Sequence, residues 1–313
     1  MPKQSTSTLM MVRPVSFRMN EQTATNNYYQ KVLNGLSANQ VNEAAVKEFD
    51  RFVGVLENKG IDVIVVQDTK EPDTPDSIFP NNWISFHADG RIGLYTMYAE
   101  NRRLERREDL FERFQNHNGL NITEIVDFTE FEDHSKYLEG TGSMVLDRHF
   151  RVAYAALSER TDRKAFEHFC EVFDYVGVVF SALQTVNEER LPIYHTNVMM
   201  CVASHFAILC ADTIDDPVER DMVMNMLKDS GKEVILITQE QTQRFAGNML
   251  EVTNTDAQPL LVMSTSAFEA LTSQQIERIE KYCEIVHSSL DTIEACGGGS
   301  ARCMMAEVFL PKI

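Results

Sequence analysis

The chain has 313 residues, of which 43% are apolar and 24% are charged, so it can bury a sizeable core and does not have the composition of a disordered protein. Its 47 acidic side chains outnumber the 29 basic ones and give a formal net charge of -18. This charge repels phosphate backbones and anionic membrane surfaces, which excludes nucleic acid and membrane surfaces as expected partners. No run approaches the roughly 18 apolar residues that a membrane helix requires.

The N-terminus and the cysteines predict a reduced, cytoplasmic protein. Only Lys3 supplies early positive charge, and the apolar stretch of a signal peptide is missing. The six cysteines stand mostly in apolar runs and lack the spacing of a disulfide framework: Cys170, Cys201, Cys210, Cys283, Cys296 and Cys303. No linker-like run divides the chain, so we expect one domain over residues 1–313, and the sequence leaves open whether it forms a homo-oligomer.

The first predicted helix lies between two apolar strands, at residues 9–13 and 61–66. Its apolar positions recur at helical spacing, namely Val41, Ala45, Phe49, Phe52 and Leu56. Gly60 is expected to end this helix in a left-handed conformation. The order is therefore strand, helix, strand.

Four further units have the order strand, strand, helix, strand. The second has strands at 83–87 and 92–95 around an Asp89-Gly90 turn, a helix at 100–116 and a strand at 122–126. The third has two strands within 143–156, a helix with Ala165, Phe166, Phe169 and Phe173, and a strand at 175–180. The fourth has strands at 198–202, 206–210 and 234–237, and its helix begins after Asp216 and ends at Gly231. The fifth has strands at 249–253, 260–263 and 284–287 and a helix at 273–282.

The last apolar run, 304–310, has no helix of its own. It could pair with the strand at 9–13, which lacks an early partner in its unit, and so close a ring. The alternative is an α+β sheet with other connections.

Five polar residues stand at corresponding positions of successive units: Asn82, Glu139, His195, Asn248 and Cys303. Their spacings are 57, 56, 53 and 55 residues. If the units are arranged around an axis, these residues lie at the same height near the centre. The sequence therefore predicts a central site.

Residues 296–304 read CGGGSARCM, which resembles the glycine-rich segment that ends in the nucleophilic cysteine of arginine deiminases and amidinotransferases. The glycines 297–299 permit positive φ angles and a close backbone approach, which would let Cys303 project from a loop into a pocket. The resemblance implies that Cys303 is the nucleophile.

His195 in YHTN resembles the catalytic histidine of this superfamily, and thiol chemistry requires a proton carrier with a near-neutral pKa. Glu139 in LEGTGS resembles the acid that orients this histidine. The segment departs from the family at Gly142, where Asp is frequent.

Arg160 in SERT resembles the arginine that holds the substrate's α-carboxylate. An arginine that precedes a helix can equally form a surface ion pair. Further matches occur in chain order at Arg13-Pro14, at FPNNW (residues 79–83) and at FAGN (residues 245–248). The FPNNW match implies that Phe79 and Asn82 contact substrate.

The resemblance spans essentially the whole chain. It implies an α/β fold, a fivefold pseudosymmetric propeller of ββαβ units known as the pentein fold, whose ring the C-terminal strand closes. It also implies a small amino-acid substrate and no metal or organic cofactor.

Two asparagines predict the charge of the substrate. Relatives that process guanidines usually have Asp where this chain has Asn82 and Asn197. Amides offer donors and acceptors without charge, which suits a ureido group better than a guanidinium cation. We therefore expect Asn82 and Asn197 to bind citrulline, and one branch of the superfamily resembles a citrulline ureidase that releases ornithine, ammonia and CO2.

Three other functions stay open at this point. An arginine or methylarginine deiminase and an amidinotransferase would both act through an S-amidino-cysteine. A non-catalytic binding protein of the same fold would be favoured if Cys303, His195 or Glu139 were missing, and all three are present.

Overall fold

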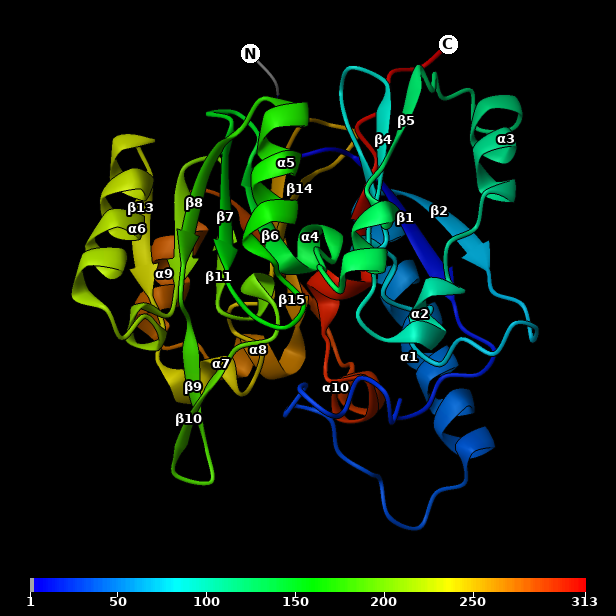
Figure 1. Ribbon diagram of the computed structural model, residues 1–313, viewed down its shortest axis with the longest axis horizontal. Helices are drawn as coiled ribbons and strands as arrows, with labels where there is room; N and C mark the ends of the chain where they lie inside the picture. Colours follow the sequence, from blue (N-terminus) through cyan, green and yellow to red (C-terminus); the bar gives the residue numbers. More distant parts are fainter. Residues whose placement is uncertain (1–2) are drawn as a thin grey trace.

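Five three-stranded sheets of the same construction build the structure, a computed structural model that describes residues 3–313 (Figure 1). The middle strand of each sheet pairs antiparallel with one neighbour and parallel with the other. Helical segments join the middle strand to its parallel neighbour, as a parallel connection requires. This order agrees with the units predicted from the sequence.

The strands are bounded as follows. The first sheet contains β17 (Ala306–Glu307), β1 (Thr8–Arg13) and β2 (Asp62–Gln67). The second contains β3 (Ile84–Phe86), β4 (Arg91–Leu94) and β5 (Glu124–Asp127). The third contains β6 (Met144–Asp147), β7 (Val152–Ala156) and β8 (Val176–Phe180). The fourth contains β11 (Met200–Val202), β12 (Phe206–Leu209) and β13 (Glu233–Leu236), and the fifth β14 (Leu250–Thr253), β15 (Pro259–Ser264) and β16 (Glu284–Ser288).

The α-helices are α1 (Ala38–Asn58), α2 (Glu100–Arg103), α3 (Asp109–Asn116), α4 (Gly140–Ser143), α5 (Arg163–Phe173), α6 (Pro217–Asp229), α7 (Gln239–Thr242), α8 (Thr265–Ala270), α9 (Ser273–Glu280) and α10 (Asp291–Gly297). Short 3₁₀ turns are η1 (Pro80–Asn82), η2 (Thr129–His134), η3 (Thr196–Val198), η4 (Ala211–Thr213) and η5 (Ala301–Met304). Within residues 3–313, none of these helices combines the length and the hydrophobicity needed to cross a membrane.

Local sequence signals explain the long helices. Ser37 and Gln40 form a capping box at the start of α1, and all five apolar residues predicted for its inner face are buried. Gly60, just after α1, has a φ of +81°. Asp216 caps α6 and Pro217 occupies its first turn, as the sequence predicts.

The two ends of the chain meet in the first sheet. β17 pairs antiparallel with β1, through Leu9 opposite Glu307 and Met10 opposite Ala306. The predicted pairing of the C-terminal run with the first strand is therefore confirmed. The strand is shorter than the predicted 304–310, since Met304 belongs to η5 and residues 308–310 continue outside the ladder.

Three predicted elements differ from the structure. The helix expected at 100–116 divides into α2 and α3, because the Arg102 side chain turns inward to Glu105 and Asn82 and these contacts override helix propensity. The strand expected at 198–202 starts as the turn η3. The hairpin β9 (Leu183–Val186) and β10 (Glu189–Pro192) lies outside the repeat, and Asn187 and Glu188 at its tip both have positive φ, as a tight two-residue turn requires.

The first strand of each sheet is preceded by a short turn or loop, and these segments position the site. They carry the five regularly spaced residues Asn82, Glu139, His195, Asn248 and Cys303, whose exposed fractions lie between 0% and 3%. α4 contacts both η1 and η3, and η1 also contacts η5. The segments therefore meet, as the equal spacing predicts.

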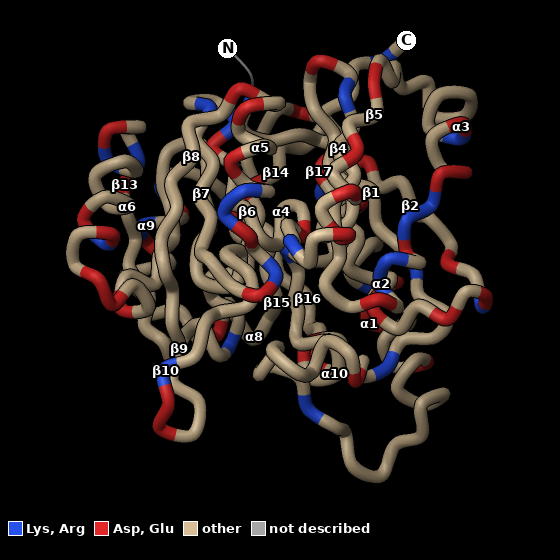
Figure 2. Tube along the Cα trace, in the orientation of Figure 1, with Lys and Arg blue, Asp and Glu red and all other residues tan. Residues whose placement is uncertain are grey.

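A long irregular segment, residues 14–37, joins β1 to α1 and passes beside α10 at the bottom of Figure 1. The backbone nitrogen of Lys31 in this segment donates a hydrogen bond to the Ala295 oxygen at 2.6 Å. We call residues 14–37 the strap. Figure 2 shows acidic and basic positions spread over the outer elements, in keeping with the acidic composition.

Candidate active site

Cys303 lies on the 3₁₀ turn η5, is 3% exposed and lines a small cavity, as the expected projection into a pocket requires. Its Sγ atom is 3.3 Å from Asn248 Nδ2 and 3.6 Å from Asn197 Nδ2. The Asn248 amide is oriented by its other contacts, since Oδ1 accepts from the Arg302 backbone at 3.1 Å and Nδ2 donates to the Asn197 oxygen at 3.0 Å. The side-chain amides of Asn248 and Asn197 therefore both contact the sulfur.

The glycine-rich segment before Cys303 is packed and is not a surface loop. Gly298 caps α10 with a φ of +61°, and a side chain there would meet Asn27 Nδ2 at 2.6 Å. A Cβ on Gly297 would lie 2.6 Å from the Phe79 ring. The predicted close approach is confirmed, and among these glycines only Gly298 uses a positive φ.

Glu139 and His195 form a buried pair, with His195 Nε2 2.7 Å from Glu139 Oε2. The Tyr98 backbone donates to Glu139 Oε1 at 2.9 Å, and Arg160 Nη1 lies 3.6 Å from Oε2. Burial alone would raise the pKa of Glu139, but the Arg160 guanidinium and the His195 hydrogen bond hold it below its ordinary value. Burial lowers the pKa of His195, and Glu139 offsets this only in part. The pair therefore holds an ionised carboxylate and a neutral imidazole that can accept a proton.

Arg160 is 2% exposed, so the surface ion pair considered from the sequence is wrong. Its Nε and Nη2 atoms donate to Asn26 Oδ1 at 2.9 and 2.5 Å, and Nη2 also donates to the Thr23 oxygen at 2.8 Å. The strap therefore holds the guanidinium beside Glu139. Its role as a carboxylate ligand stays a prediction.

Arg102 and Asp76 lie in the same cavity wall as Asn82, and neither of them was predicted from the sequence. Arg102 Nη1 donates to Asn82 Oδ1 at 2.8 Å, and Arg102 Nε lies 2.8 Å from Glu105 Oε1 and 4.0 Å from Asp76 Oδ2. Asp76 Oδ2 accepts hydrogen bonds from Asn20 and Thr23 at 2.8 and 3.0 Å. Asp76 Oδ1 is buried and has no hydrogen-bond partner among residues 3–313. A buried carboxylate oxygen without a donor is suited to a ligand that brings one.

These groups surround a cavity of about 10 Å³, which is room for about one water molecule. Its walls are Thr23, Asn27, Asp76, Phe79, Asn82, Arg102, Arg160, Tyr194, His195, Gly297, Gly299 and Cys303. An amino acid does not fit this volume, so binding one requires the surrounding chain to move. Thr23 and Asn27 belong to the strap, which therefore forms part of the wall.

Five of the seven predicted site residues line this cavity, and Glu139 and Asn197 do not. Phe79, Asn82, Arg160, His195 and Cys303 line it. Glu139 stands behind His195 instead. Asn197 does not line it either, because its amide lies beside the sulfur and faces a second small cavity with Arg302 and Glu307. The role of Asn197 as a substrate ligand stays a prediction, because its amide lies 3.6 Å from the sulfur but outside the wall of the present cavity.

The sequence does not mark either of the missed residues. Asp76 is the last of three acids in residues 71–76, shortly before the FPNNW segment, so the sequence does not distinguish it from Glu71 and Asp73. Arg102 is one of several arginines in a charged run, and its 2% exposure alone distinguishes it. Cys296 is buried in a hydrophobic cluster.

Gly142, the position that departs from the family pattern, has no space for a side chain. A Cβ there would lie 2.7 Å from His195 Cε1 and would also collide with Asn82 Nδ2. We expect Gly142→Ala to reduce kcat/KM by at least about a hundredfold, because displacing a reacting group by about 1 Å has an effect of that size. Steady-state kinetics with thermal unfolding would measure this, and Gly54→Ala, where a Cβ meets nothing within 4 Å, is the matched control. Equal activity of the two variants would contradict the expectation.

The comparisons with known proteins agree with the α/β fold. ArgZ, an arginine dihydrolase of the ornithine-ammonia cycle in cyanobacteria, has a similar structure with a TM-score of 0.71 and 17% identity over 98% of this chain. The chain spans 41% of full-length ArgZ, whereas it covers 99% of the ArgZ N-terminal domain in a substrate-bound structure with a TM-score of 0.70 and 17% identity. A dimethylarginine dimethylaminohydrolase adduct with S-methyl-L-thiocitrulline gives a TM-score of 0.63 and 12% identity, over 96% of this chain and 98% of that one. No curated protein matches the chain significantly.

These similarities show an α/β fold like that of the pentein enzymes. The family model described as "N,N dimethylarginine dimethylhydrolase, eukaryotic" matches residues 13–310. Since this match covers nearly the whole chain, the protein belongs to that family.

Proposed function

We propose that the protein is a cysteine-dependent hydrolase that breaks a C–N bond of citrulline and yields ornithine, ammonia and CO2. Residues 1–313 would act as one catalytic domain, in which the five sheets stand as blades around an axis. The contacts of β11 with β6 and β14, and of β17 with β3, support this arrangement. Six free, buried cysteines are consistent with the cytoplasm.

The reaction requires two covalent steps. Cys303 gives its thiol proton to the neutral His195, its sulfur adds to the ureido carbon, and the bond from this carbon to the δ-nitrogen breaks as His195 passes that proton to the nitrogen. Water then attacks the S-carbamoyl carbon while His195 accepts its proton, the C–S bond breaks, and His195 returns the proton to the sulfur. The released carbamate decomposes to ammonia and CO2. Glu139 holds the His195 ring and stabilises its protonated form.

Asn82 is the observation that favours a neutral ureido group. Arg102 occupies its Oδ1 atom and one Nδ2 hydrogen is donated to Asn81 Oδ1 at 3.2 Å, so the group left for a ligand is the second Nδ2 hydrogen, and Nδ2 lies on the side of Gly142 and His195. A ureido oxygen accepts hydrogen bonds from such a donor. A guanidinium group has no acceptor to offer it.

The remaining charges suit the α-amino acid part of the substrate. Arg102 and Arg160 line the cavity and can face a carboxylate, and the unpartnered Oδ1 of Asp76 can accept from an α-ammonium group. Asp76 also supports a second candidate, an arginine deiminase or dihydrolase, because the same oxygen could hold a guanidinium.

A substrate panel separates these candidates. We expect citrulline to have a kcat/KM at least about tenfold above those of arginine, methylarginine and agmatine, with ornithine and ammonia as products, because one mismatched hydrogen bond is worth roughly that factor. Asp76→Asn should reduce the preference for citrulline over its analogue without the α-amino group. Faster release of ammonia from arginine, with citrulline as product, would instead establish a deiminase.

A further inference from the structure

The helix α10 ends just before the turn that carries Cys303. Glycines 297–299 lead from this helix to Ser300, and η5 follows. The Cys303 backbone nitrogen donates to the Ser300 oxygen at 3.0 Å, so the place of the sulfur depends on the place of Ser300. Because glycine is conformationally permissive, three glycines in succession do not by themselves fix the residue that follows them. A contact from outside the glycines is required to hold Ser300.

Glu294 on α10 supplies this contact. The Ser300 hydroxyl donates a hydrogen bond to Glu294 Oε1 at 2.6 Å, a short distance that is typical of a hydroxyl group on a carboxylate. Glu294 is 7% exposed and Ser300 is 0% exposed, so water competes little for this bond. The backbone oxygen of Glu294 also accepts from the Gly298 nitrogen at 3.0 Å. Glu294 therefore holds the segment both within the glycines and beyond them.

The helix that carries Glu294 is itself anchored to the long helix α1. Glu48 of α1 accepts hydrogen bonds from the backbone nitrogens of Thr292 and Ile293 at 2.9 and 3.1 Å, and the two helices pack against each other. These bonds satisfy two of the free nitrogens at the start of α10. Since α10 is fixed at this end, the hydrogen bond from Ser300 to Glu294 attaches the turn to the body of the protein.

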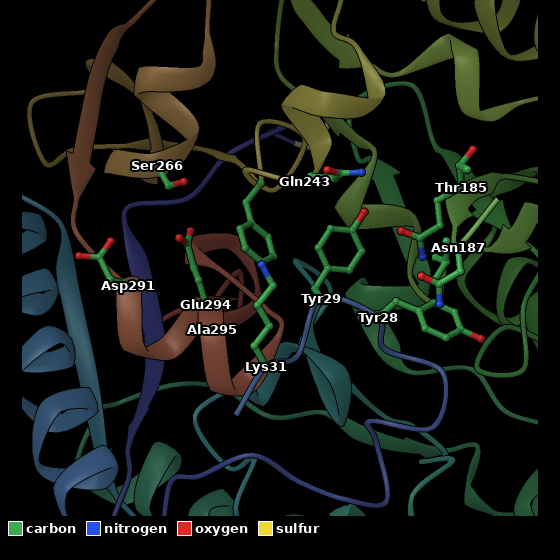
Figure 3. A pocket seen from close by; sticks show the side chains of 13 residues that line it. Tyr28, Tyr29, Lys31, Thr185, Asn187, Gln243, Ser266, Asp291, Glu294 and Ala295 are labelled. Carbon is green, nitrogen blue, oxygen red and sulfur yellow. The ribbon is translucent and has the colours of Figure 1, made fainter. Parts of the chain in front are cut away.

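Glu294 lies outside the catalytic cavity, in the wall of a second pocket of about 490 Å³. Figure 3 shows it on α10 between Asp291 and Lys31. Neither Glu294 nor Ser300 is among the residues that line the catalytic cavity. Burial raises the pKa of Glu294 to about 7, so the folded protein disfavours its ionised form. The bond from Ser300 offsets part of the free energy that burying this carboxyl group costs.

We propose that Glu294 is a positioning residue for the nucleophile, and that through Ser300 it fixes the turn on which Cys303 lies. Asn248 holds the same turn from another side, where its Oδ1 accepts from the Arg302 backbone at 3.1 Å. Exact placement matters, since displacing a reacting atom by about 1 Å can slow a reaction about a hundredfold. The proposal rests on the proposed function in one respect, which is that Cys303 is the nucleophile.

Steady-state kinetics with the substrate that the wild type hydrolyses tests the proposal. We expect Glu294→Ala and Ser300→Ala each to lower kcat at least about tenfold, because the nucleophile is displaced. KM should stay within about threefold of the wild type, because neither side chain lines the cavity. The double variant should lose no more than about threefold beyond the slower single variant, since both substitutions break the same bond. Glu294→Gln should keep kcat within about threefold of the wild type, because its amide oxygen still accepts from Ser300.

The matched control is Asp291→Ala, which removes an exposed carboxyl group from the same helix and should leave kcat within about threefold of the wild type. Thermal unfolding shows that each variant is folded. Three results would overturn the proposal: an unchanged kcat in Glu294→Ala or Ser300→Ala, losses that multiply in the double variant, or a loss in Glu294→Gln as large as in Glu294→Ala.

The rate at which iodoacetamide labels Cys303 tests the same hydrogen bond without turnover. Cys303 is 3% exposed, and releasing the turn should label it at least about threefold faster in Glu294→Ala and Ser300→Ala than in Asp291→Ala. The mass of the peptide that contains Cys303 gives this rate. Equal rates in all three variants would contradict the role of Glu294. A wild type that hydrolyses no ureido or guanidino compound would contradict the proposed function instead, and the labelling rates would still show whether Glu294 holds the turn.

Discussion

Replacing Cys303 by alanine is expected to reduce kcat by at least about ten-thousandfold, because the variant lacks the atom that forms the covalent intermediate. The protein should remain folded. Its free energy of unfolding should fall by about 1 kcal/mol, since the Asn248 and Asn197 amides next to the sulfur lose a partner. Steady-state kinetics and denaturant unfolding measure the two effects.

The matched control for Cys303→Ala is Cys296→Ala, which removes another buried thiol seven positions earlier in the chain. Cys296 lies in a hydrophobic cluster and does not line the cavity, so its loss should leave kcat within about a factor of three of the wild type. Intact-mass measurement of the quenched wild type should show an adduct that Cys303→Ala lacks. Comparable rates for the two alanine variants would reject Cys303 as nucleophile.

Asn82→Asp is expected to lower the ratio of kcat/KM for citrulline to that for arginine by at least about tenfold. The substitution replaces the Nδ2 donor of the cavity by a carboxylate oxygen, which repels a ureido oxygen and attracts a guanidinium. Arg102, 2.8 Å from the present Oδ1, would pair with the new carboxylate and keep it ionised. The kinetics of both substrates for both proteins give the ratio.

Asn197→Asp is the control for the charge argument, because Asn197 touches the sulfur and does not line the cavity. A carboxylate there would oppose the thiolate and should slow both substrates with little change in their ratio. Combining the two substitutions would therefore mix a substrate effect with a nucleophile effect. If Asn82→Asp leaves the ratio unchanged, or the wild type already prefers arginine, Asn82 does not encode a ureido substrate.

The sequence by itself determined the order of the elements and the residues of the central site. Apolar spacing located α1 and α5, and helix caps located the ends of α6, because these signals are local and each depends on a few neighbouring residues. Regular spacing selected Asn82, Glu139, His195, Asn248 and Cys303, because each residue precedes the first strand of one sheet in a repeated unit.

Only the tertiary structure decided which side of the sulfur each residue occupies and which charges face the cavity. Asn197 is two positions from His195 in the sequence, yet it turns toward the second small cavity, because the 3₁₀ turn η3 separates the two side chains. Arg102 and Asp76 acquire their places through contacts with Asn82 and with the strap, across separations of 20 and more residues. Local patterns carry no information about such contacts, since burial of a charged side chain depends on partners supplied by distant segments.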